Sequence, residues 1–223
     1  MNKRPVQTLA IIPLSILSIF GAGGNQNLIS PSSGEQIVAE KEMSLANRYG
    51  NQFVNDVFKN NILLNIAYLS GKVASAKDIK WDEITKPSKY EFTLNPNKTF
   101  AFHQDVKEQY KDSLVKTTNA NFNAQDGFKT DGYLFGDGVC HLASLINWVA
   151  QEAKLSVEAP TNHNFANIPD IPKQYGVSIY KNPGSCSSNQ LQNLYITNNK
   201  SKTITFKFEY NNDKVKVSVV KLN

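Results

Sequence analysis

Two stretches of the chain repeat their apolar residues at the helical period of 3.6. The first covers residues 44–70, with Ser44 in the position of an N-cap, Gly50 as a point at which it could divide, and Gly71 at its end. The second follows Gly138 and carries apolar side chains from residue 142 to residue 153. Both patterns predict amphipathic helices whose apolar faces pack into a core rather than around a cofactor.

Strand patterns with a period of two recur at several places from residue 90 onwards. Residues 90–94 and 99–102 flank an Asn-Pro-Asn turn and predict a hairpin, and residues 203–210 and 214–220 flank Asn-Asn-Asp and predict a second one. Further strands are predicted at residues 177–180 and 194–197, and the polar residues 104–132 show no clear period. The fold class predicted is α+β, with a helical N-terminal segment before a mixed domain of helix and antiparallel sheet.

Composition removes several classes of protein. A chain of 223 residues with 40% hydrophobic residues is long enough for one ordinary domain, and two cysteines cannot build a disulfide-rich scaffold or a Cys₄ zinc site. The net charge of +5 comes from lysines that are spread along the chain, whereas a nucleic-acid-binding surface needs them clustered. We therefore expect no nucleic-acid partner, no metal site and no cofactor.

The N-terminus has the pattern of an export signal. Lys3 and Arg4 precede an apolar run at residues 9–20, and small residues follow at 21–24. This run is shorter than the roughly 20 residues that span a bilayer comfortably. We expect a signal peptide or an N-terminal membrane anchor at residues 1–24, a polar linker at 25–40 and an extracytoplasmic location, with membrane contact only through an uncleaved leader.

The sharpest local feature is the segment around Cys140, where Gly136-Asp137-Gly138 precedes the predicted helix and places Cys140 in its first turn. A helix N-terminus carries about half a positive charge and lowers the pKa of a cysteine there. The free amides from Gly138 to His141 could also stabilise an oxyanion. These features predict a nucleophilic cysteine, although many buried cysteines occupy the same position.

A thiolate nucleophile needs a base, and the chain has three histidines. His163 precedes the strand-rich half and is the predicted base, with a loop histidine bonded to the backbone as the alternative. His141 follows Cys140 directly and is expected beside the catalytic site, whereas His103 could as easily be a surface residue. The orienting group could be Asp170, Asn164 or Gln174. Such an arrangement is typical of papain-like and transglutaminase-like sites.

Four segments carry a resemblance to a known family. The central one is GYLFGDGVCHLAS at residues 132–144, flanked by LNPNKTFAF at 94–102, EAPTNHN at 158–164 and NLYITNN at 193–199. In this order they resemble the VanW family, whose central pattern is close to GYGGGVCQVSS. The resemblance implies a VanW-like domain at residues 90–221 after a helical region at 41–89. It also implies a cell-envelope setting, because the family is named after an accessory gene of vancomycin-resistance clusters.

The resemblance matches Cys140 to the motif cysteine and His163 to the motif histidine. The chain departs from the pattern at His141, where the family has Gln, and at Tyr175, where the family has an Asp. The second departure leaves the third member of a triad open, since Asp170 could replace that Asp only if its loop folds back.

Three functions remain open. The first is an exported cysteine hydrolase or acyl-transfer enzyme that acts on an amide in peptidoglycan or in a surface protein. Its substrate contacts would come from Gly136, Asp137, Gly138 and Asn164. The second is a non-catalytic module that binds cell-wall peptide or glycan. The third is a structural domain held by a Cys140–Cys186 disulfide, which an oxidising compartment would allow. In each case we expect a monomer.

Overall fold

The computed structural model describes residues 34–222, and the predicted leader lies outside the described residues. Its helices and strands follow in the order β1 (Glu35–Ser44), α1 (Gln52–Ser70), α2 (Trp81–Ile84), β2 (Ser88–Leu94), β3 (Thr99–Ala101), β4 (Leu114–Lys116), α3 (Val139–Glu152), β5 (Ser156–Glu158), α4 (Cys186–Asn189), β6 (Tyr195–Thr197), β7 (Ile204–Asn211) and β8 (Lys214–Leu222). Short 3₁₀ turns lie at Ala76–Asp78, Glu108–Tyr110, Ala124–Asp126 and Lys173–Tyr175. None of the helices in this part of the chain is long and apolar enough to cross a membrane.

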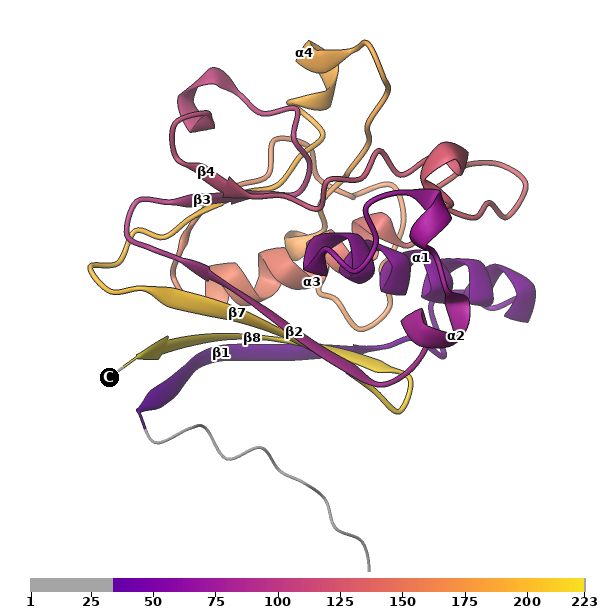
Figure 1. Ribbon diagram of the computed structural model, residues 1–223, viewed down its shortest axis with the longest axis horizontal. Helices are drawn as coiled ribbons and strands as arrows, with labels where there is room; N and C mark the ends of the chain where they lie inside the picture. The colour runs from indigo at the N-terminus through magenta and orange to yellow at the C-terminus, as the bar shows by residue number, and fades with distance from the viewer. Residues whose placement is uncertain (1–33, 223) are drawn as a thin grey trace, which may run out of the picture. The chain divides into compact units, whose positions relative to one another are not determined.

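The strands form two four-stranded sheets, so the α+β class is confirmed. The first sheet has the order β1-β8-β7-β2 and is antiparallel throughout. The second has the order β4-β3-β6-β5, in which β3 and β4 are parallel and the other pairs antiparallel. Figure 1 shows α3 above the first sheet, with β3 and β4 higher still, and α3 contacts β1 and β8.

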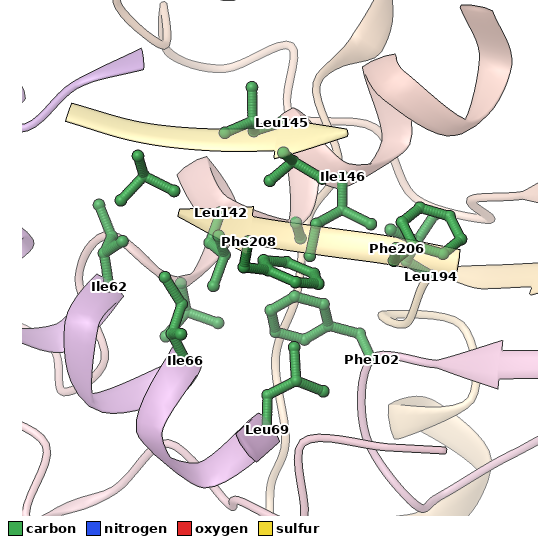
Figure 2. Close-up of a cluster of buried hydrophobic side chains, with 14 of the residues drawn as sticks. Ile62, Ile66, Leu69, Phe102, Leu142, Leu145, Ile146, Leu194, Phe206 and Phe208 are labelled. Carbon is green, nitrogen blue, oxygen red and sulfur yellow. The ribbon is translucent and has the colours of Figure 1, made fainter. Parts of the chain in front are cut away.

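The core lies between the two long helices and the first sheet. Figure 2 shows side chains of α1, α3 and β7 meeting there with residues that flank strands of the second sheet, among them Ile62, Ile66, Leu69, Phe102, Leu142, Leu145, Ile146, Leu194, Phe206 and Phe208. Burial of one such aliphatic or aromatic side chain contributes about 1.5–3 kcal/mol. This core holds the start of α3, and therefore Cys140, at a fixed position above the sheet.

The C-terminal hairpin of β7 and β8 is confirmed, with Asn212 and Asp213 in the left-handed conformation that its turn requires. The predicted hairpin at residues 90–102 is wrong, because β2 pairs with β7 and β3 pairs with β6 in the other sheet. The predicted strand at residues 177–180 is also wrong, since only Val177 forms an isolated bridge, to Asn162.

The N-terminal helical prediction needs one correction. Residues 35–44 form β1, an edge strand paired with β8, where the sequence predicted a linker and then the start of a helix. The helix begins at Gln52, because the Asn51 side chain accepts a hydrogen bond from the Val54 amide and acts as the N-cap. It ends at Gly71 as predicted, in the left-handed conformation with φ of 75°.

Candidate functional site

The Gly136-Asp137-Gly138 turn is fixed against α1 and the loop before it. Gly138 has a φ of 94°, and a Cβ there would lie 2.7 Å from the carbonyl oxygen of Phe58. A Cβ on Gly136 would lie 2.9 Å from the carbonyl oxygen of Phe122. The Asn61 amide group donates at 3.0 Å to the Asp137 carbonyl. The two glycines are therefore required by close backbone packing and by a left-handed conformation.

Cys140 lies in the first turn of α3, as predicted, and its thiol is bonded to the main chain of Ile179. The Sγ donates to the Ile179 carbonyl at 3.5 Å, and the Ile179 amide donates to Sγ at 3.3 Å. Burial raises the pKa of the Cys140 thiol to about 11, and the nearby charge of Asp137 adds to this effect. Desolvation and the charge of Asp137 therefore favour the neutral thiol of Cys140 over the thiolate.

Two of the amides expected to stabilise an oxyanion are already bonded within the turn. The Val139 amide donates to the Gly136 carbonyl and the His141 amide to the Gly138 carbonyl, both at 3.0 Å. A preformed oxyanion hole needs donors that point at the substrate. The Val139 and His141 amides therefore stabilise the turn that begins α3 and are not free to bind a substrate oxygen.

His141 and His163 face each other, with ring centroids 6.4 Å apart and the rings nearly perpendicular. The His141 ring also packs 4.9 Å from Phe58, and its Nδ1 has no hydrogen-bond partner in the described residues. Burial lowers the pKa of His141 to about 3, with the charge of Arg48 acting in the same direction. This ring is therefore neutral at physiological pH.

His163 has a defined tautomer. Its Nδ1 lies 3.2 Å from the Ala166 carbonyl oxygen and therefore donates to it, so in the neutral ring Nε2 is the acceptor. Among the described residues no hydrogen bond joins either His163 or His141 to the Cys140 thiol, whose partners are the amide and carbonyl of Ile179. The neutral His163 ring thus has the tautomer that a general base requires, but among the described residues it is not hydrogen-bonded to the Cys140 thiol.

Asp170 does not orient His163, because its carboxylate pairs with Arg48 at 2.5 Å. It also accepts the Ser44 amide at 2.9 Å, which ties the end of β1 to this loop. The Arg48 side chain is fully buried, and the Asp170 side chain is about one-third exposed. In this structure Asp170 is paired with Arg48 rather than with His163, and the Ala166 carbonyl is the group bonded to the His163 ring.

The remaining candidates lie elsewhere. Asn164 is exposed, and its backbone N–H donates to the side-chain oxygen of Asn162. His103 is fully buried, with Nε2 against the Gln192 carbonyl at 3.0 Å, and burial lowers its pKa to about 4. Gln174 is exposed in the turn Lys173–Tyr175. None of the three lies among the residues around Cys140.

Both cysteines are free thiols, so the disulfide alternative is not realised in this structure. Cys186 is exposed at the start of α4, and Cys140 is partly buried. In the part of the chain that is described, no group of three or more His, Cys, Asp or Glu side chains could hold a metal ion.

Cys140, His141 and His163 line one cavity of about 580 Å³, together with Gly136, Asp137 and Gly138. Its rim carries exposed aromatic side chains, of which Tyr133 is 91% and Phe165 76% exposed. Other segments that the sequence does not mark also line the cavity, through Arg48, Tyr49, Phe58, Tyr180 and Lys181. No local pattern marks them, because they join the cavity only through long-range packing.

The segment from residue 88 to residue 220 matches the model of a protein family described as VanW like protein. The chain belongs to this VanW-like family. No curated protein and no solved structure matches the chain. The match begins at β2, yet Arg48 and Phe58, which precede it, line the same cavity as Cys140. The candidate site of this VanW-like protein therefore depends on residues outside the matched segment.

Proposed function

We propose that this VanW-like protein is an exported, non-catalytic module of the cell envelope whose cavity binds peptidoglycan. The observation that carries the proposal is the double hydrogen bond between the Cys140 thiol and Ile179, both of which line an aromatic-rimmed cavity. A cysteine nucleophile needs a thiolate, and a pKa of about 11 leaves almost none at neutral pH. The cavity is therefore better suited to hold a ligand than to attack one.

The composition of the cavity rim suits a ligand polymer that has both apolar and polar faces. Tyr49, Tyr133, Phe165 and Tyr180 are all more than half exposed, although such side chains are usually covered in a soluble protein. Side-chain amides lie among them, at Asn121, Asn123, Gln125, Asn167 and Asn182. Aromatic faces offer stacking surfaces and amides offer hydrogen bonds, which suits the sugars and short peptides of the wall.

Export is part of the proposal and rests on the sequence. The basic residues and the apolar run at residues 1–24 have the pattern of a signal peptide or an N-terminal anchor. In this setting the protein binds the cell wall outside the cytoplasm as a monomer and contacts the membrane only through an uncleaved leader.

The test is co-sedimentation of the purified protein with peptidoglycan sacculi, using Tyr133→Ala with Phe165→Ala as the variant. Hot-spot aromatics contribute about 2 kcal/mol or more each, so we expect a loss of affinity of at least about tenfold. Phe53→Ala is the matched control, because Phe53 is 64% exposed but does not line the cavity. Equal binding by all three proteins, or no binding by the wild type, would refute the proposal.

A second candidate, the cysteine hydrolase, is favoured by one observation. The His163 Nδ1 contact with Ala166 leaves Nε2 as an acceptor, which is the tautomer a general base requires. Mass spectrometry of the supernatant in the same assay separates the two functions. Peptide fragments released by the wild type and absent with Cys140→Ala would establish the hydrolase, whereas intact sacculi with bound protein support the binding module.

A further inference from the structure

Lys181 is a largely buried side chain that lines the cavity, and its ammonium group makes no hydrogen bond among the described residues. It is 9% exposed, and in the described residues its Nζ donates to no oxygen within hydrogen-bond distance. The carboxylate oxygen found near it is Asp105 Oδ1, at 3.9 Å. This separation is too long for a hydrogen bond, whose usual N···O distance is about 2.9 Å.

The ammonium group of Lys181 is incompletely satisfied, because its ion pair with Asp105 lacks a hydrogen bond. An ammonium carries three donors, and buried charges are normally paired and hydrogen-bonded. Asp105 is already engaged, since its Oδ2 accepts the Asn189 side chain at 2.6 Å. Burial lowers the pKa of Lys181, and the nearby charges of Asp105 and Asp126 oppose this effect. The donors of Lys181 are therefore free for an acceptor that enters the cavity.

The charges around the cavity favour an anionic acceptor. Its lining contains three charged side chains, Arg48, Asp137 and Lys181. Arg48 is paired with Asp170, which lies outside the lining. Asp137 faces the charge of Asp131, and burial and that charge raise its pKa to about 6. Lys181 is the cation with the least complete pairing, so its surroundings would gain most from a carboxylate.

We infer that Lys181 binds the free C-terminal carboxylate of a peptidoglycan stem peptide in this cavity, an inference that rests on the proposed function and names the ligand group. The ammonium would donate to the carboxylate oxygens, while the exposed rings of Tyr180 and Phe165 contact the apolar parts of the peptide. A lactyl carboxylate on a muramic-acid sugar has the same chemistry, and the experiment separates the two sources.

The experiment is calorimetric titration of the full chain with three probes: a synthetic stem peptide with a free C-terminal carboxylate, the same peptide as its carboxamide, and N-acetylmuramic acid. A charge-assisted hydrogen bond favours the carboxylate over the amide, so we expect the wild type to bind the free acid at least about tenfold more tightly. Lys181→Met should bind the acid and the carboxamide equally. Lys77→Met is the control, because Lys77 is exposed and does not line the cavity.

The outcomes distinguish this inference from the proposed function. Equal affinity of the wild type for acid and carboxamide overturns the inference and leaves peptidoglycan binding intact. A preference for N-acetylmuramic acid over the peptide overturns the assignment to the peptide terminus. No binding of any probe and no binding to sacculi removes the proposed function itself. The ratio of the wild-type affinities for the free acid and the carboxamide can be measured without any variant, so the test remains valid even if Lys181→Met fails to fold. Lys181→Gln provides a second variant.

Discussion

The thiol of Cys140 and the main chain of Ile179 form a reciprocal pair of hydrogen bonds, at 3.5 Å and 3.3 Å. The pair connects the first turn of α3 to the extended segment that continues to Lys181. Ser144 makes a parallel connection one turn later, since its hydroxyl accepts the Val177 amide at 2.9 Å. Cys140 therefore acts as a positioning residue, because it holds the segment that carries Tyr180 and Lys181 at the cavity.

The Arg48–Asp170 pair should be a major stabilising contact between the loop after β1 and the loop after His163. Asp170→Asn leaves the fully buried Arg48 side chain without its countercharge. We expect a loss of unfolding free energy of about 2–3 kcal/mol, below the value for a fully buried pair because Asp170 is partly solvated. Urea denaturation measures this loss.

The control for this pair is Glu83→Gln, which removes an exposed partner of Lys86. Exposed ion pairs contribute about 0–1 kcal/mol, so this variant should unfold close to the wild type. An equal effect of the two substitutions would contradict the structural role given to Arg48.

Gly138→Ala should destabilise the protein more than the same change at Gly184. Both glycines have a positive φ, but the added Cβ meets the Phe58 carbonyl oxygen at 2.7 Å in the first case and open space in the second. We expect about 3 kcal/mol or more at Gly138, and about 1 kcal/mol at Gly184 from backbone strain alone. Thermal unfolding of the two variants compares them, and equal losses would mean that the turn does not pack tightly on α1.

Asp137 should make the protein more sensitive to rising pH. Burial raises the folded-state pKa of Asp137 to about 6, above the unfolded value of about 3.9. The stabilising contribution of this group is thus complete below pH 4 and is lost as the pH rises through 6. Asp137→Asn removes the penalty, so its stability relative to the wild type should increase by about 1–2 kcal/mol between pH 4 and pH 7, after allowance for solvent screening.

Urea titrations at the two pH values test this linkage, with Asp112→Asn as the control because Asp112 is exposed and forms no ion pair within residues 34–222. A difference between Asp137→Asn and the wild type that is the same at both pH values would show that the Asp137 carboxyl is solvated in the folded protein.

The parts of the fold that the sequence predicts are those encoded by the local alternation of apolar and polar residues. Phe206 and Phe208 in β7 and Val217 and Val219 in β8 face the core, with polar residues between them, so the hairpin was visible. Strand β1 was missed because most of its residues are polar and only Met43 is buried, as suits an edge strand. The partner of β2 could not be predicted, because β7 lies more than 100 residues further along the chain and the turn at Pro96 favoured the local pairing.

The candidate site likewise has a part that neighbouring residues predict and a part that depends on long-range contacts. The Gly-Asp-Gly turn and the helix start at Cys140 follow from neighbouring residues, and the family was visible in four short segments. The hydrogen bonds of Cys140 to Ile179, 39 positions away, could not be read from spacing, and they change the chemistry of the thiol. The pairing of Asp170 with Arg48 could not be predicted either, because Arg48 lies 122 positions earlier.

The central claim is that Cys140 is a structural thiol beneath a binding cavity, and its alkylation rate against pH tests this claim most directly. The measurement uses iodoacetamide on the Cys186→Ser protein, with mass spectrometry of the Cys140 peptide and a His163→Ala variant alongside. We predict slow alkylation at neutral pH, a midpoint above that of a free thiol at about 8.5, and no change in this midpoint without His163. Fast alkylation with a midpoint well below 8.5 that shifts when His163 is removed would contradict the account and establish an ion-paired nucleophile.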